Sequence, residues 1–230
     1  MIIAVDLHIH TALSPCADDD MTPNNIVNMA LIKGLDAIAI TDHNSCDNVE
    51  AVIKVAGDRL LVVPGMEVQT REEVHLLCYF DDLDKLIHFD GIIRRHLTKI
   101  LNKPEVFGHQ YIMNELDEVT GEREELLISS VDMAIDELVE KVRKYSGVVV
   151  PAHVDRPSYS ILSQLGFIPP DLGFRMLEIS QDYGYLAAKY PQMSYIHSSD
   201  AHSLGQILER ECFIDVADYS VAEVLNYLKG

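Results

Sequence analysis

The chain has 230 residues, of which 48% are hydrophobic, and a formal net charge of −19. This length and hydrophobic content suffice for one large core and exclude an intrinsically disordered chain. No apolar stretch is long enough to span a bilayer, so no membrane partner is expected. The acidic balance argues against a stable complex with nucleic acid, because most of the surface would repel phosphate.

The cysteines and the N-terminus predict a cytoplasmic protein. The first residues lack the basic region of a signal peptide. No CxxC pair occurs, which predicts reduced, mostly buried thiols at all four cysteines: Cys16, Cys46, Cys78 and Cys212. The sequence gives no indication of the oligomeric state.

Strands and helices are predicted to alternate along the first hundred residues. They are a strand at 2–8, a helix at 22–33, a strand at 35–41, a helix at 47–56, strands at 60–63 and 74–80, and a helix at 82–101. Thr22 and Asp47 are the expected helix caps, and Gly34 is expected to end the first helix. Pro64-Gly65 is expected to break the third strand.

The alternation continues after a polar, glutamate-rich stretch at 102–130. The later elements are a helix at 131–145 capped by Ser130, strands at 148–150, 176–179, 194–199 and 211–215, and a final helix capped by Ser220. Strands separated by helical stretches predict parallel βαβ units, and therefore an α/β barrel. A single domain over 1–230 is expected, with residues 84–130 as a possible insertion or lid.

Side chains that bind divalent metals recur where the apolar runs end. In a barrel of parallel strands these ends meet at one face and would bring the side chains together. Period-2 alternation also places His8 and His10 on the same side of their strand. Imidazole with carboxylate suits zinc, manganese or iron. The sequence thus predicts a multinuclear metal site, and its candidate residues are His8, His10, His43, Glu67, His75, His153, Asp200 and His202.

A family resemblance rests on five segments. They are Asp6-Leu7-His8-Ile9-His10-Thr11, Ile40-Thr41-Asp42-His43-Asn44, Pro64-Gly65-Met66-Glu67, Ala152-His153-Val154-Asp155-Arg156-Pro157 and Ser199-Asp200-Ala201-His202. With these segments the chain resembles the polymerase and histidinol phosphatase (PHP) superfamily of metal-dependent phosphoesterases over nearly its whole length. The resemblance is weakest at 84–130. It implies a distorted barrel of about seven β/α units, similar to a TIM barrel, with two or three divalent ions.

The resemblance also implies how the ligands are shared. His8, His10, Glu67 and Asp200 would hold one ion, and Glu67 would bridge to a second. His75 and His153 would bind that second ion or a neighbouring one. A third would take His43, His202 and an acid after His10. Asp18 is the preferred acid, with Asp19, Asp20 and Cys16 as alternatives.

Two further residues are predicted to serve the reaction. Arg156 follows His153 by three positions and could hold a phosphate through a two-pronged contact. Asp42 could orient a neighbouring imidazole. The predicted activity is hydrolysis of a small phosphate ester by a metal-activated water, on a nucleotide, a sugar or amino-alcohol phosphate, or the end of an oligonucleotide.

Two other functions stay open. An amidohydrolase-type barrel also begins with HxH, but it usually has a metal-bridging lysine, whereas Lys33 and Lys54 fall in predicted helices. A PHP domain can also serve as a scaffold that lacks activity, although the set of ligand-type residues here is complete. His88, His96 and His109 are predicted to lie outside the site.

Overall fold

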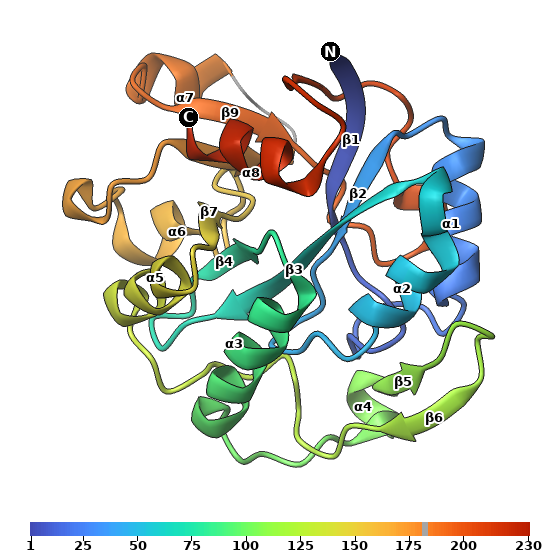
Figure 1. Ribbon diagram of the computed structural model, residues 1–230. Helices are drawn as coiled ribbons and strands as arrows, with labels where there is room; N and C mark the ends of the chain where they lie inside the picture. Colours follow the sequence, from blue (N-terminus) through green and yellow to red (C-terminus); the bar gives the residue numbers. More distant parts are fainter. Residues whose placement is uncertain (181–183) are drawn as a thin grey trace.

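The computed structural model describes residues 1–180 and 184–230 and shows a mixed α/β fold (Figure 1). Its centre is a curled six-stranded sheet. In spatial order its strands are β10 (Phe213–Asp215), β1 (Ile2–Ile9), β2 (Ala37–Ile40), β3 (Leu61–Gln69), β4 (His75–Tyr79) and β7 (Val148–Pro151). Two smaller sheets pair β8 (Met176–Ile179) with β9 (Ser194–His197) and β5 (Tyr111–Met113) with β6 (Val119–Glu122).

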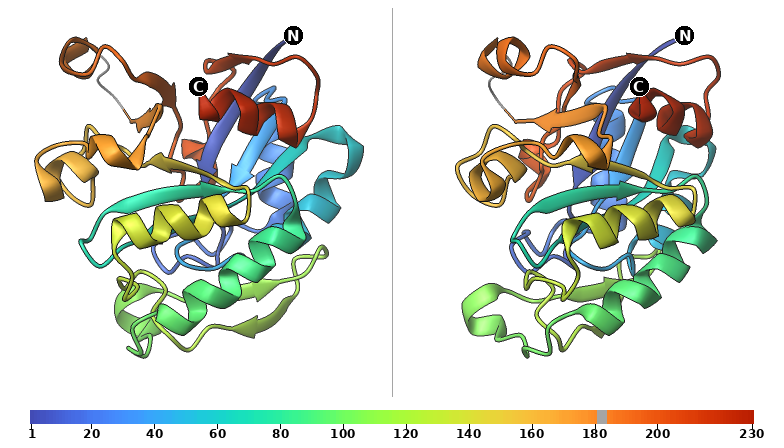
Figure 2. Two further views of the ribbon diagram at one scale, coloured as in Figure 1. Left: turned by 60° about the vertical axis from the view of Figure 1, so that its left-hand side comes forward. Right: turned by 90° about the vertical axis from the view of Figure 1, so that its left-hand side faces the viewer.

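Helices surround this sheet. The α-helices are α1 (Pro23–Ile32), α2 (Val49–Ala56), α3 (Leu83–His96), α4 (Pro104–Phe107), α5 (Ile135–Lys144), α6 (Ile161–Leu165), α7 (Gly184–Lys189) and α8 (Val221–Lys229). Short 3-10 helices lie at Gly57–Arg59, Pro170–Leu172 and Leu204–Gln206. Figure 2 shows α3 and α5 side by side over one part of the sheet, with the β5–β6 hairpin beyond them.

The strands do not all run parallel, so the prediction of uniform βαβ units was wrong for part of the sheet. β1, β2 and β3 pair in parallel, as do β8 and β9. In contrast, β4 is antiparallel to both β3 and β7. The reason is the connection at 70–74, which is too short for a crossover helix and allows only a hairpin. As a result β4 begins, rather than ends, at the edge where β3 ends.

Pro64-Gly65 marks a change of partner rather than the predicted end of a strand. Up to Pro64, β3 pairs with β2, and from Gly65 onward it pairs with β4. A β-carbon on Gly65 would lie only 3.0 Å from Thr41 Cγ2 and 3.1 Å from the Ile40 carbonyl oxygen. Glycine therefore permits the close approach of the strands that lets β3 continue to Glu67.

The two faces of the sheet bury separate apolar clusters. Along β1, Ala4 and Ile9 belong to the cluster beneath the outer helices, while Ile3, Val5 and Leu7 belong to the cluster on the inner face. Helix α8 adds Val224, Leu225 and Leu228 to the inner cluster. This helix contacts β3, β7 and β10. The polar side chains of the sheet gather at its other end.

The start of a helix was predicted correctly where the capping side chain bonds to the first turn of its own helix. Thr22 caps α1 and Ser220 caps α8 through their side chains, as predicted. Asp47 does not cap α2, because its carboxylate pairs with Arg94 and Arg123 from outside that helix. Ser130 likewise does not cap α5, which begins at Ile135. Helix α3 ends at His96, several residues before the predicted end.

Residues 97–130 contain α4 and the β5–β6 hairpin and bind to the loop that follows β1. Asn48 makes the central link, since its amide nitrogen donates to Thr11 Oγ1 at 2.9 Å and to the Tyr111 carbonyl at 3.0 Å. Its amide oxygen accepts from the Met113 N–H at 2.8 Å.

Among the described helices, none has both the length and the apolar character needed to cross a bilayer.

Candidate metal centre

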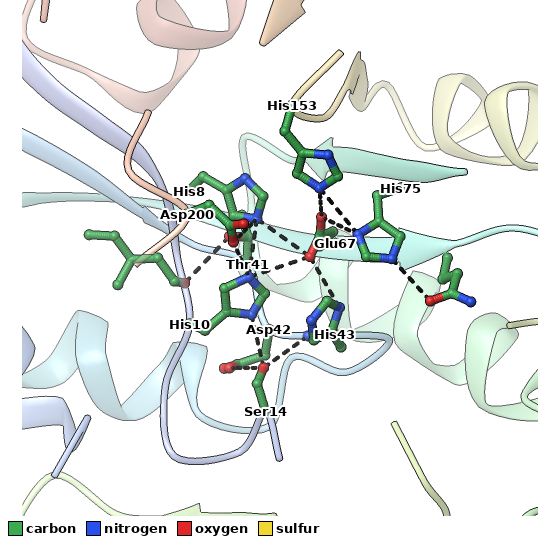
Figure 3. Close-up of polar contacts among 12 residues, drawn as sticks. His8, His10, Ser14, Thr41, Asp42, His43, Glu67, His75, His153 and Asp200 are labelled. Carbon is green, nitrogen blue, oxygen red and sulfur yellow. Dashed lines mark hydrogen bonds and ion pairs between the residues drawn. The ribbon is translucent and has the colours of Figure 1, made fainter. Parts of the chain in front are cut away.

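Eight of the predicted ligands meet at the polar end of the sheet. They form a group that we call the histidine cluster: His8, His10, His43, Glu67, His75, His153, Asp200 and His202. Figure 3 labels all of these residues except His202. All but His202 are buried. Residues separated by most of the chain length are thus brought together, as the sequence predicted.

Two backbone bridges bring the segments into place. Ile9 forms a parallel bridge with Ala201, in which the Ala201 N–H donates to the His8 carbonyl at 3.1 Å and the His10 N–H donates to the Ala201 carbonyl at 2.9 Å. This pairing sets Asp200 beside the two histidines of β1. His43 and Glu67 form a second parallel bridge between the end of β2 and β3.

Outer partners determine which nitrogen of each ring faces the cluster. His8 Nδ1 lies 2.8 Å from the Glu178 carboxylate, and His202 Nδ1 lies 2.8 Å from the Asp200 carbonyl. A carboxylate and a backbone carbonyl are acceptors, so each Nδ1 carries the proton. In each of these rings, Nε2 is then the atom with a free lone pair.

The same holds for His10 and His75. The Ser14 hydroxyl donates to Asp42 Oδ1 at 2.7 Å and therefore accepts from His10 Nδ1 at 3.0 Å. Gln69 donates its amide to Ser130 and presents its oxygen to His75 Nε2 at 3.0 Å. His10 Nε2 and His75 Nδ1 are the atoms left facing the cluster.

Imidazole nitrogens of the cluster converge on the two oxygens of the Glu67 carboxylate. Glu67 Oε1 lies 2.8 Å from His75 Nδ1 and 3.2 Å from His153 Nε2. Glu67 Oε2 lies 3.1 Å from His43 Nδ1 and has no hydrogen-bond partner among the described residues, nor does that nitrogen. A buried carboxylate oxygen that faces an imidazole lone pair is stabilised when a cation lies between the two atoms.

Three sets of ligand atoms are close enough to share an ion. Within each set the atoms lie within 4.8 Å of one another: His8, His10, Glu67 and Asp200; His43, Glu67 and His75; and His10, His43 and His202. Glu67, His10 and His43 each belong to two sets. The donor types and the shared members fit a site for more than one metal ion.

The charges of the cluster favour bound cations. Burial opposes ionisation of Glu67, but the surrounding histidines hold the pKa of its carboxyl well below the usual range. Burial also lowers the pKa of His10, yet the hydrogen bond to Asp200 and the negative charges of Asp200 and Glu67 outweigh it and raise that pKa to about 9. For His202, burial and the nearby His10 lower the pKa to about 4. At pH 7 the metal-free cluster thus holds an ionised Glu67, a protonated His10 and a neutral His202, and a metal ion bound at His10 would take the place of its proton.

Three further predicted residues lie outside the three ligand sets. The Asp18 carboxylate is exposed and belongs to none of the three ligand sets of the described chain, although the Asp18 N–H donates to the His202 carbonyl at 2.8 Å. Asp42 supports His10 through Ser14, not the adjacent His43. Arg156 pairs with Asp200 Oδ2 and donates to Ser180 Oγ at 3.1 Å. It therefore lies on the rim of the cluster.

Glu178 is the main residue that sequence reasoning missed. It lies inside β8, is 1% exposed, and accepts from both His8 Nδ1 and the His153 N–H, the latter at 2.7 Å. One acidic residue within the apolar strand Met176–Ile179 was the available signal, because a buried carboxylate needs a partner. Ser14 and Gln69 carried no comparable signal.

The cluster opens into a small pocket of about 140 Å³, whose rim carries Arg156, Ser158 and Tyr159. The two lysines considered in the sequence pair away from the cluster. Lys33 pairs with Glu209, and the exposed Lys54 pairs with Glu50. His88 and His96 also lie outside the cluster, since each ring bonds to a backbone carbonyl one turn earlier in α3.

Comparison with known proteins agrees with this geometry. The family model of the PHP domain matches residues 6–149, and the chain therefore belongs to the PHP domain family. An uncharacterized protein of Methanocaldococcus jannaschii is 28% identical over 167 residues, which are 73% of this chain and 18% of that protein. The chain thus spans less than a fifth of this relative's length.

Solved structures share the fold. The lesion-specific endonuclease Q of Pyrococcus furiosus matches the whole chain with a TM-score of 0.72 and 20% identity, over 56% of its own length. An endonuclease Q complex, which matches the whole chain with a TM-score of 0.71 and 20% identity, holds a 27-mer duplex substrate with an abasic lesion at the active site. A Bifidobacterium adolescentis protein described as a metal-dependent phosphoesterase matches 97% of this chain and 96% of its own, with a TM-score of 0.64 and 19% identity.

Proposed function

We propose that this chain is a metal-dependent phosphoesterase that hydrolyses a small phosphate ester with the help of two or three divalent ions, of zinc, manganese or iron. Membership of the PHP family supports hydrolytic, metal-dependent chemistry. The observation that carries the proposal is the convergence of imidazole lone pairs on the buried Glu67 carboxylate, which needs cations to be stable.

The proposed ligands are those of the histidine cluster. His8, His10, Glu67 and Asp200 would hold one ion, His75 and His153 would join Glu67 at a second, and His43 and His202 would serve a third with Asp18. The last ligand requires the loop after His10 to turn its carboxylate inward. Asp42 and Glu178 would act on the ions indirectly, by fixing the rings of His10 and His8.

Divalent ions supply, when bound, charge that stabilises phosphoryl oxygens and a nucleophilic water. The residues of this chain would do the rest. Arg156, on the pocket rim, would bind a phosphoryl oxygen with the part of its guanidinium that remains exposed. The buried walls of the cluster would exclude bulk water from the reacting phosphorus.

The substrate class follows from pocket size and surface charge. A pocket of about 140 Å³ admits a phosphoryl group and little more. The net charge of −19 disfavours a long polyanion, so a nucleotide, a sugar or amino-alcohol phosphate, or an oligonucleotide end is proposed. Endonuclease Q, which shares the fold, binds a 27-mer duplex substrate with an abasic lesion. Internal phosphodiesters are therefore the competing substrate class.

We also propose that residues 1–230 act as one domain in which the sheets close into a distorted seven-stranded barrel. Single contacts support closure, since the Val154 N–H donates to the Glu178 carbonyl between the β7 and β8 segments, and Ala201 bridges to β1. Residues 97–130 would act as an attached brace. The four free thiols support a cytoplasmic location.

The test is a phosphatase screen over phosphorylated metabolites, with manganese or zinc added and inorganic phosphate as the product measured. Phosphate release that a chelator abolishes is expected. Ammonia release from amides or amines without phosphate release would instead favour the amidohydrolase alternative. Metal binding without hydrolysis of any ester, including duplex DNA, would favour a scaffold.

A further inference from the structure

Tyr159 stands at the mouth of the pocket and has no place in the proposed chemistry. It belongs to the segment 154–160 between His153 and α6, which we call the mouth loop. Its ring stacks on the ring of His75, with centroids 4.9 Å apart and an interplanar angle of 21°. The residue is nevertheless 44% exposed and lines the same pocket as Glu67 and Arg156. One face of the ring is therefore covered by His75, and much of the remainder faces solvent beside the pocket.

The backbone keeps this ring in place at a cost. Tyr159 has a φ of +55°, a left-handed conformation that is unfavourable for an aromatic residue. Its carbonyl accepts from the His75 N–H at 2.8 Å, and the next residue, Ser160, caps α6 through its side chain. An exposed ring contributes little core packing, so stability alone does not account for an aromatic side chain at this position.

The size of the pocket determines what can reach this ring. About 140 Å³ accommodates the phosphoryl group, whereas pockets that enclose whole small ligands are several times larger. The rest of the ester must therefore lie outside, over the mouth loop. The Tyr159 hydroxyl makes no hydrogen bond to the described residues, so the surface offered there is chiefly an aromatic ring. A flat heteroaromatic group is the ligand that such a ring binds best.

We infer that Tyr159 is a stacking platform for the base of a nucleoside phosphate whose phosphoryl group enters the histidine cluster. This inference rests on the proposed function, because the phosphate must bind in the cluster for the base to reach the ring. It deepens that function by naming the substrate class. Tyr159 would thereby determine specificity without taking part in the chemical step.

The experiment compares two esters that differ in the base. Phosphate release from adenosine 5′-monophosphate and from glycerol 1-phosphate is measured with manganese for the wild type, Tyr159→Phe and Tyr159→Gly. Glycine tolerates the positive φ, so this variant removes the ring without adding backbone strain. Loss of one base–aromatic stack should raise KM for the nucleotide by roughly 5- to 100-fold in Tyr159→Gly. Tyr159→Phe should behave as the wild type, and KM for glycerol phosphate should not change.

A different result is expected if Tyr159 serves only to position His75. If the ring only steadies His75, Tyr159→Gly will reduce kcat and metal content equally for both esters, and the inference is overturned. Equal KM values for both esters in the wild type would overturn it as well.

Calorimetric titration of both esters into the manganese-loaded protein separates failure of the inference from failure of the proposed function. Tighter binding of the nucleotide that is lost in Tyr159→Gly, with no turnover, would retain the platform and reject the phosphoesterase. Turnover with unchanged binding and unchanged KM in Tyr159→Gly would retain the phosphoesterase and reject the platform. Binding of neither ester would reject both.

Discussion

The histidine cluster and the mouth loop meet at one pocket but are built differently. In the cluster, Glu67 is 1% exposed and the rings of His8, His10 and His75 are fixed by outer partners. In the mouth loop, Tyr159 is 44% exposed and Arg156 is only partly buried. Under the proposed function this difference corresponds to a division of roles, in which the sheet edge would hold the ions and the loop would select the substrate. Substitutions in the two regions should therefore fail in different ways.

The largest effect is expected inside the cluster. His10→Ala and Asp200→Ala each remove a ligand-type atom from a buried set, and each should lose bound metal and reduce kcat by more than about 100-fold, beyond the range for an outer partner. His96→Ala is the matched control, because its ring bonds only to a backbone carbonyl on α3. Elemental analysis and phosphate release measure both properties. Full metal content in either cluster variant would show that the substituted residue is not a metal ligand.

The outer partner of His8 provides the next test. Glu178→Gln keeps an oxygen that can accept from His8 Nδ1 but removes the charge that makes the ring a stronger ligand. Metal affinity should fall by about 10- to 100-fold, measured by competition with a chelator of known affinity. Glu140→Gln, on the exposed side of α5, is the control. Unchanged affinity in Glu178→Gln would mean that the Glu178 carboxylate has a purely structural role.

A substitution in the mouth loop should separate substrate binding from metal binding. Arg156→Lys replaces a two-pronged contact with a point charge. We expect kcat/KM for the best phosphate ester to fall by roughly tenfold to a hundredfold, with metal content unchanged. If Arg156→Ala retains the kcat/KM of the wild type, the arginine does not bind substrate. If metal is lost with activity, its pairing with Asp200 is its main role.

The smallest effect concerns the support behind the cluster. Asn48→Ala would leave Thr11, Tyr111 and Met113 without their shared partner, at a cost of about 1–3 kcal/mol in the free energy of unfolding. The melting temperature should drop by roughly 2–12 °C in a protein of this size. Asn226→Ala, exposed on α8, should leave it unchanged. Equal melting temperatures for both variants would show that the hairpin does not brace the β1 loop.

The two regions also differ in how far the sequence predicted them. Ligand-type residues at the ends of apolar runs indicated the cluster because strand ends gather at one edge of a sheet. Glu178 was missed because a single acid inside a short strand does not indicate which residue it contacts, and its partner His8 lies 170 residues away in the sequence. The antiparallel course of β4 was missed because the prediction considered the sequence of strands and not the length of the 70–74 connection.

The mouth loop was predictable only in part. Arg156 was found by its distance along the chain from His153, but its pairing with Asp200 depends on the bridge between Ile9 and Ala201. Tyr159 gave no signal, since the positive φ and the stacking on His75 exist only in the folded chain. Asp18 shows the same difficulty for loops: the family resemblance implied an acid after His10, whereas the fold leaves the Asp18 carboxylate exposed.

The central claim is that the histidine cluster holds several ions at once. Its most direct test is stoichiometric titration of the metal-free protein with manganese or zinc, with bound metal measured by elemental analysis after removal of the excess. Shared membership of Glu67, His10 and His43 in overlapping ligand sets predicts two or three equivalents. Fewer than one equivalent after reconstitution would contradict the account.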